Sequence, residues 1–113
     1  MNDDCIFCKI ASGQIKSDII SSNDDVVAFN DIAPQAPVHI LVVPKEHISK
    51  LEDTKDFSLI NRIFSAINDI VYTKGLQKTG YRVVVNSGHD SGQAVDHLHF
   101  HILGGRKMTW PPG

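Results

Sequence analysis

Three histidines alternate with apolar residues near the end of the chain. Successive side chains of a β-strand point to opposite faces, so the alternation predicts a strand with His97, His99 and His101 on one face. The apolar residues between them would then face a core. Imidazole is the side chain whose unperturbed pKa lies near neutrality, which suits such a row to nucleophilic attack, proton transfer or metal binding. A histidine-rich surface strand is the alternative, and the bulky apolar neighbours disfavour it.

Two cysteines near the start of the chain, Cys5 and Cys8, form a C-x-x-C pair, and the chain has no others. A structural disulfide is not expected in a chain of the cytosolic type. A redox pair would be typical of a strand–helix–strand setting, which the surrounding sequence does not show. Two thiolates are also half of a tetrahedral zinc site, which needs two further ligands.

The length and charge of the chain limit the classes of protein to which it can belong. At 113 residues it is one domain, and its net charge of −2 gives no basic character that would favour nucleic acid. No apolar run is long enough to span a membrane, and the start, Met1-Asn2-Asp3-Asp4, lacks the apolar core of a signal peptide. We therefore expect a cytoplasmic protein without a nucleic-acid or membrane partner.

Apolar runs predict the strands that position the histidines. Compact runs bounded by turn residues predict three strands before the triad, at residues 26–29, 38–43 and 81–85. Pro44 ends the second of these strands. The segments at 31–37 and 86–96, rich in proline or glycine, are expected to be loops.

Helical spacing predicts two helices. Apolar residues followed by Gly13 predict a short N-terminal helix. A longer run with a 3.6-residue period predicts an amphipathic helix from about residue 54 to Lys74, with Gly75 as its C-terminal stop. The whole pattern predicts an α+β fold, in which an antiparallel sheet carries one long helix and a short N-terminal helix.

The triad motif looks like that of the histidine triad (HIT) family of nucleotide-binding hydrolases and transferases. Segments 29–39, 43–48 and 84–86 each resemble parts of that family, in the family's order, and the ending at 104–113 is similar to the Hint branch. The resemblance implies a single HIT domain over residues 1–113. It also implies a homodimer whose two sheets join into one, with the tail at 106–113 reaching toward the partner's active site.

The resemblance further implies a purine nucleoside phosphoramidase, similar to an adenosine 5′-monophosphoramidase. Such an enzyme cleaves the P–N bond between the α-phosphate of a nucleotide and its leaving group. His99 matches the attacking histidine, which forms a covalent nucleotidyl intermediate, and its neighbours on either side can fix its tautomer. His101 is placed to donate to a phosphate oxygen, and His39 supports the pair by hydrogen bonding. The alternatives are a dinucleoside polyphosphate hydrolase and a nucleotide-binding interaction protein with weak turnover.

Expected substrate contacts follow from the same resemblance. Asp31 matches an acid that binds the ribose hydroxyls, and Asn86 matches an amide near the phosphate. Many Hint-like sequences carry a serine that helps protonate the leaving group at the position where this chain has Ala94. Gln93, a water or the histidines would then supply the proton. The other expected contacts come from the wall of the base pocket, the loop before the triad and the tail: Ile6, Phe7, Ile10, Phe29, Ile32, Val95 and Trp110.

Some HIT proteins hold a structural zinc ion with two cysteines and two histidines, and this chain resembles that variant. The matching ligands are Cys5, Cys8, His47 and His97. The zinc would tie the N-terminal segment and the loop after the second strand to the catalytic strand. The two roles of His97 conflict, because a ring that binds zinc cannot also orient His99 with both nitrogens. The remaining histidine, His89, lies in a polar loop and is expected to be exposed.

Overall fold

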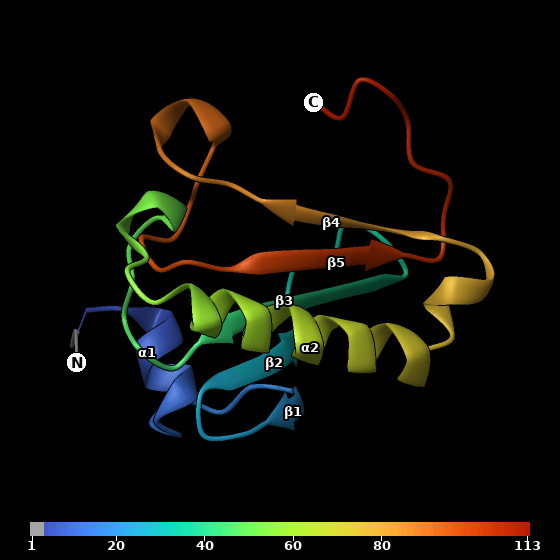
Figure 1. The fold of residues 1–113 in the computed structure, drawn as a ribbon. Coiled ribbons are helices and arrows are strands. Elements are labelled where there is room, and N and C mark those ends of the chain that lie inside the picture. Colours follow the sequence, from blue (N-terminus) through green and yellow to red (C-terminus); the bar gives the residue numbers. More distant parts are fainter. Residues whose placement is uncertain (1–3) are drawn as a thin grey trace.

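Five strands form one antiparallel sheet in the computed structural model, which describes residues 4–113 (Figure 1). The strands are β1 (Ile19–Ser22), β2 (Val26–Asn30), β3 (Val38–Pro44), β4 (Tyr81–Val85) and β5 (Phe100–Gly104), in the spatial order β1-β2-β3-β5-β4. Helix α1 (Ile6–Ala11) precedes the sheet, and α2 (Phe57–Thr73) lies between β3 and β4 in the chain. This architecture confirms the predicted fold class. The acidic residues 1–3 lie outside the described residues.

Strands β2 and β3 are apolar on both faces because each face of the sheet is covered. On one face, Val26, Ala28, Ile40 and Val42 pack into a core with the apolar side of α2. On the other face, alternate residues of the same strands pack against α1: Val27, Phe29, Leu41 and Val43. Continuous apolar runs are the sequence pattern of strands buried in this way. Pro44, predicted to end β3, is its last residue and lies opposite Val26.

Helix α2 begins at Phe57, later than the predicted start near residue 54. The segment before it forms a short 3₁₀ turn at Leu51–Asp53, and the Asp56 carboxylate then accepts the N–H of Ser58 at 3.0 Å, which caps the helix. Gly75 adopts a φ of +70° just after the helix, as predicted for its stop. Among the described residues, no helix is long and apolar enough to cross a membrane.

Two strand predictions need correction. Strand β5 begins at Phe100, so His97 and His99 precede it, although Leu98, Phe100 and Ile102 still share the α2 core as the alternation predicts. Strand β1 is absent from the sequence prediction. It is mostly exposed, pairs only with β2 and has an irregular register between Ile19 and Ser21, so it carries no apolar alternation to detect.

Candidate active site and metal-binding cluster

Strands β3 and β5 bring two of the predicted catalytic histidines together. The register pairs Leu41 with His101 and His39 with Leu103, which puts His39 and His101 on the same face of the sheet. This is the α1 face, away from α2. The His39 Nε2 atom lies 2.9 Å from His101 Nδ1. Neighbouring antiparallel strands thus join residues from the middle and the end of the chain.

The hydrogen bonds of this pair fix the tautomers of the neutral rings. The backbone N–H of Gln35 donates to His39 Nδ1 at 3.0 Å, so that nitrogen has the lone pair and Nε2 has the hydrogen. His39 Nε2–H then donates to His101 Nδ1, which leaves the hydrogen of His101 on Nε2. That Nε2 atom is buried and has no hydrogen-bond partner among the described residues. Such a donor is available to a ligand oxygen.

His99 has the opposite tautomer. Its Nδ1 atom lies 2.7 Å from the main-chain carbonyl oxygen of His97, and a carbonyl oxygen only accepts, so Nδ1 has the hydrogen. The lone pair of the neutral ring is therefore on Nε2. The rings of His99 and His101 are 5.0 Å apart, and Phe7 packs edge-on against His99 at 5.1 Å between centroids. A main-chain carbonyl, rather than a neighbouring ring, fixes this tautomer.

Burial keeps the two hydrogen-bonded rings neutral near pH 7. Burial, followed by the nearby rings of His99 and His39, lowers the pKa of His101 from its ordinary 6.5 to about 4. Burial also lowers the pKa of His39. The Asp31 carboxylate, whose Oδ2 lies 3.4 Å from His39 Nε2, opposes both shifts without reversing them.

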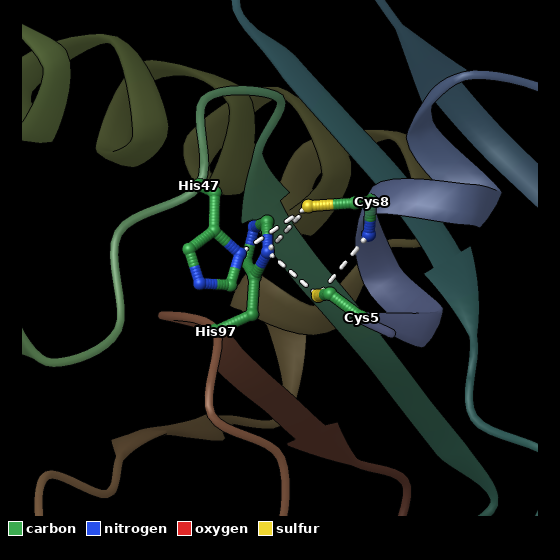
Figure 2. Close-up of side chains that lie close together, drawn as sticks. All are labelled: Cys5, Cys8, His47 and His97. Carbon is green, nitrogen blue, oxygen red and sulfur yellow. Dashed lines mark hydrogen bonds between the residues drawn. The ribbon is translucent and has the colours of Figure 1, made fainter. Parts of the chain in front are cut away.

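The cysteine-bearing cluster joins four residues from three segments of the chain (Figure 2). Cys5 and Cys8 come from α1 and its cap, His47 from the loop after β3, and His97 from the segment before β5. His97 Nδ1 lies 3.2 Å from Cys5 Sγ and 3.5 Å from Cys8 Sγ, and His47 Nδ1 lies 3.3 Å from Cys8 Sγ. One donor atom from each residue lies within 4.8 Å of all the others, so the cluster could hold a metal ion.

The surroundings of this cluster suit a bound metal ion. His97 Nε2 donates to the Pro44 carbonyl oxygen at 2.8 Å, which leaves the Nδ1 lone pair facing the sulfurs. Burial lowers the pKa of His97 and raises the pKa of the Cys5 thiol, although the Cys8 N–H that donates to Cys5 Sγ opposes the second shift. Neutral imidazoles are what a metal needs, and a bound cation would deprotonate the thiols.

The predicted base-pocket residues differ in exposure. Phe7, Ile10 and Phe29 are buried in the core beneath α1. In contrast, Ile32 is 95% exposed and Ile6 is 44% exposed. Asp31 forms a turn, because its Oδ1 accepts the N–H of Ala33 at 2.8 Å.

The loop before the triad is held by Gln93. Its amide nitrogen donates to the carbonyls of Ser49 and Val95, at 2.7 and 3.0 Å, and its amide oxygen accepts the N–H of Gly88 at 2.8 Å. Both amide hydrogens are thus engaged, so this side chain has no hydrogen left for a leaving group. Ala94 lines two hollows, of about 290 and 570 Å³. Asn86 is partly buried just after β4, and His89 is fully exposed as expected.

The C-terminal tail lies on the β4 side of the sheet (Figure 1). Arg82 of β4 donates to the carbonyl of Thr109 at 2.9 Å, and Arg106 donates to the carbonyl of Gln35 at 3.0 Å. Trp110 is nevertheless 82% exposed. The tail is therefore docked by its backbone, and its tryptophan is available to another surface.

Two site features carried no sequence signal. They are the Gln35 N–H, which sets the tautomer of His39, and the Pro44 carbonyl, which orients His97. Both are backbone groups: every residue has a carbonyl, and every residue except proline has an N–H. Only the fold indicates which of them meet a histidine.

The antiparallel sheet with its paired histidines agrees with what the family comparison finds. The family model described as the HIT domain matches residues 12–108. The chain belongs to the HIT domain family.

Three relatives are similar over most of the chain. An uncharacterised HIT-like protein of Synechococcus elongatus is 47% identical, with full coverage of both chains. A HIT family hydrolase of Legionella pneumophila has a structure with a TM-score of 0.94 and 44% identity, over 97% of this chain and 100% of that chain. A histidine triad nucleotide-binding protein of Candida albicans has a TM-score of 0.85 and 32% identity, over 96% and 83%. The class is thus that of HIT hydrolases and nucleotide-binding proteins.

Proposed function

We propose that this HIT protein is a hydrolase that cleaves the P–N bond between the α-phosphate of a purine nucleotide and an amine leaving group. The observation that carries the proposal is a pair of complementary nitrogens on neighbouring rings. His99 presents a lone pair at Nε2, and His101 presents a buried N–H without a partner among the described residues. A nucleophile beside an unpaired donor suits in-line substitution at phosphorus.

The reaction has two steps. In the first, His99 Nε2 bonds to the α-phosphorus while the bond from phosphorus to the leaving nitrogen breaks, and the amine takes up a proton from solvent water and departs. His101 donates its Nε2–H to a phosphate oxygen as negative charge develops there. In the second step, the oxygen of a water bonds to the phosphorus and the water gives a proton back to solvent. The bond from phosphorus to His99 Nε2 breaks, which releases a nucleoside monophosphate and frees the ring. His39 keeps His101 in the donating tautomer, and so acts through it.

The nucleoside would occupy the surface next to these rings. Asp31 keeps lone pairs free after its contacts with Ala33 and His39, because a carboxylate has about four acceptor sites, and these suit two ribose hydroxyls. Ile32 has an exposed side chain that a purine would cover. Asn86 would contact the phosphate or leaving group. The buried residues beneath would support the base: Phe7, Ile10 and Phe29.

The loop before the triad favours two alternatives. Position 94 has no hydroxyl, and the Gln93 amide hydrogens are already donated to carbonyls. General-acid assistance contributes roughly 10²–10⁴-fold, so slow release of amines would make the protein a nucleotide-binding partner with weak turnover. A polyphosphate leaving group needs no proton, so the same feature favours dinucleoside polyphosphates as alternative substrates.

Zinc is the metal that the cysteine-bearing cluster best fits, because two thiolates and two imidazoles match its ligand preference. Cys5, Cys8, His47 and His97 would close the coordination shell, so the ion would be structural and would leave no position for substrate. Buried free thiols also suit a reducing compartment, in keeping with a cytoplasmic protein.

A homodimer would cover the apolar surface that one chain leaves exposed. Phe57, Phe64 and Tyr72 on α2 are each at least 46% exposed, and β4 is an edge strand whose first residue, Tyr81, is 44% exposed. A partner sheet added at β4 would satisfy that edge. The tail beside β4 would then bring Trp110 toward the partner's substrate site.

Mass spectrometry of the intact protein tests the proposed function. We expect a nucleotidyl adduct on His99 after mixing with adenosine 5′-phosphoramidate and quenching without acid, because phosphohistidine is acid-labile. His99→Gln should give no adduct, and His89→Gln, a change at an exposed histidine, should behave as wild type. Nucleotide binding without an adduct from any substrate would contradict the proposal. A faster reaction with dinucleoside polyphosphates would assign the protein to that alternative.

A further inference from the structure

The α1 face of the sheet is open on the side of β4. Helix α1 packs on β2 and β3 there, and not on the strands beyond them. The register puts Val84 opposite His101 and Arg82 opposite Leu103, so these four side chains share that face. All four residues are partly exposed, and Val84 and Leu103 belong to neither apolar core. A ligand held by His101 can therefore extend toward β4 over an apolar floor.

Arg82 connects this floor to a hollow at the root of the C-terminal tail. The tail leaves the end of β5 beside the start of β4, and the hollow of about 220 Å³ lies between these two segments (Figure 1). Arg82, Arg106 and Lys107 all line it, and no acidic side chain does. Three positive charges thus meet at one place in a chain whose net charge is −2.

Hydrogen bonds orient the two guanidinium groups without neutralising them. Arg82 donates to the carbonyl of Thr109 at 2.9 Å. Arg106 donates through Nε to the carbonyl of Gln35 at 3.0 Å and through Nη1 to that of Lys107 at 3.2 Å. Each guanidinium has five N–H donors, so both keep hydrogens to donate. Within the described part of the chain, none of the three cations forms an ion pair. A carboxylate or a phosphate is the partner that such groups prefer.

The hollow lies within reach of a leaving group. Arg82 and His101 are diagonal neighbours on adjacent strands, and the Cα atoms of such residues are about 7–8 Å apart. In substitution at phosphorus, the leaving group lies opposite the attacking atom, and so away from His99. His101 and Leu103 follow His99 along the chain, toward the end of β5 where the hollow lies. A partner strand paired at β4 would use main-chain groups of that edge, so Arg82 would stay on the open face.

We propose that this hollow binds an oxyanion at the far end of the leaving group, and that Arg82 determines the resulting substrate preference. The inference rests on the proposed function and names its substrate class, which is nucleoside phosphoramidates whose amine carries a carboxylate. The side chains of Val84 and Leu103 contact the carbon chain between the amine and the carboxylate. A polyphosphate leaving group offers the same oxyanion chemistry, and the experiment below separates the two sources.

Paired substrates that differ in charge but not in size test the inference. The pairs are adenosine 5′-phosphoramidates of glycine, β-alanine and γ-aminobutyrate, each as the free carboxylate and as the carboxamide. The measurement is the rate of adduct formation on His99. We expect wild type to favour the carboxylate by roughly tenfold at one chain length, as hydrogen bonds to charged groups do, and Arg82→Gln to lose that preference.

Three further variants control for charge and for the tail. Lys107→Gln should weaken the preference, and Arg82→Lys, which keeps the charge, should retain part of it. Lys74→Gln removes the same charge at the end of α2, on the other face of the sheet, and should behave as wild type. Release of Thr109 in the Arg82 variants acts on both members of a pair, so the ratio within a pair is free of it.

Equal rates within every pair in wild type, or a preference that survives in Arg82→Gln, would overturn the inference and leave the proposed function intact. An adduct from diadenosine triphosphate alone, formed more slowly by Arg82→Gln, would remove the P–N function and support the site with polyphosphate as its ligand.

A protein that forms no adduct with any of these substrates would contradict the proposed function, and binding then tests the site by itself. Inorganic pyrophosphate is titrated while the arginine Nε–H signals are followed by NMR. A saturable shift that Lys107→Gln weakens would support the oxyanion site. Signals that do not move would overturn it.

Discussion

The two clusters of imidazoles on the α1 face have similar ligand geometry and opposite hydrogen bonding. Cys5, Cys8, His47 and His97 form one cluster, and Asp31, His39 and His101 form the other, each with ligand atoms within 4.8 Å of one another. In the first, the outer nitrogen of His97 donates to a carbonyl, so its inner nitrogen has a lone pair. In the second, the outer nitrogen of His39 accepts an N–H, so its inner nitrogen has the hydrogen.

This difference assigns the clusters to different chemistry. A neutral imidazole binds a metal only through a nitrogen that has a lone pair. His97 therefore points a ligand atom at its sulfur neighbours, whereas His39 points a donor at His101. The distances between ligand atoms alone would have suggested two metal sites. The backbone groups behind the rings suit the first cluster to a metal ion and the second to the hydrogen-bond donation proposed above.

The largest expected effect is the loss of turnover on removing the proposed nucleophile His99, whose ring lies beside His101 of the second cluster. We expect His99→Gly to lower kcat by at least about 10⁴-fold, as for other enzymes that lose a nucleophile, while a nucleoside monophosphate still binds. The mutation leaves Asp31 and Ile32, the proposed ribose and base contacts, in place. Steady-state kinetics and calorimetric titration measure the two quantities. Turnover within tenfold of wild type would remove the covalent mechanism.

The second prediction separates the clusters by their metal content. We expect about one zinc per chain in tag-free protein, lost in Cys8→Ser and retained in His39→Gln. At free zinc a thousandfold above Kd, binding adds about 4 kcal/mol to the free energy of unfolding, so Cys8→Ser should also melt at lower temperature. Elemental analysis and thermal melts measure both. Zinc that disappears with His39→Gln instead would show that the clusters are assigned the wrong way round.

The third prediction concerns the stability of the second cluster toward acid. The pKa of His101 is about 4 in the folded chain and ordinarily 6.5. Between pH 6.5 and pH 4 the imidazole is therefore protonated in the unfolded chain and neutral in the folded one, so a falling pH favours unfolding. The free energy of unfolding is unaffected by this ring above about pH 6.5. It decreases by about 3 kcal/mol as the pH falls from there to about 4. The lowered pKa of His39 acts in the same direction.

Denaturant unfolding of wild type and His101→Gln, both with excess zinc, isolates this effect from metal loss at low pH. We expect the stability of wild type to fall relative to the variant as the pH decreases through that window. A difference between the two proteins that stays constant from pH 7 to pH 4 would mean that the ring is not buried as a neutral group.

The sequence could predict which residues share a face but not what their ring nitrogens do. Alternation placed Leu98, Phe100 and Ile102 in the core because side-chain direction follows from strand geometry alone. The tautomers of His39 and His99 depend on backbone groups at Gln35 and His97, whose positions arise only when distant segments fold together. The start of β5 was missed for a related reason, since ladder pairing depends on the neighbouring strands and not on alternation.

Side-chain roles in the loop before the triad were harder still to predict. Gln93 was one of three expected proton sources, with a water and the histidines, and its amide is engaged with Gly88, Ser49 and Val95. A glutamine next to a glycine gives no sign of which backbone groups it will meet. In contrast, Cys5 and Cys8 could be assigned to one cluster from their spacing, because two residues in one helical turn present their side chains together.

The smallest expected effect concerns the tail, which lies outside both clusters. Arg82 fixes the Thr109 carbonyl while Trp110 stays exposed, so the tail is positioned without being buried in its own chain. In a dimer joined at β4, that tryptophan would meet the leaving group at the partner's His99. We expect truncation after Lys107 to change kcat/KM unequally across leaving groups, by roughly threefold to tenfold, or less than about 1.4 kcal/mol.

Trp110→Ala is the matched variant, because it removes the ring and keeps the backbone that Arg82 holds. It should reproduce the unequal changes if the tryptophan causes them, and sedimentation of both proteins should show that the dimer persists. Adduct formation on His99 should continue in each, since His99 and the His97 carbonyl that accepts its Nδ1–H both lie outside the tail. Equal changes for amine, acyl and polyphosphate leaving groups would separate the tail from substrate choice, because a residue that touches the leaving group must distinguish among groups of different size and charge.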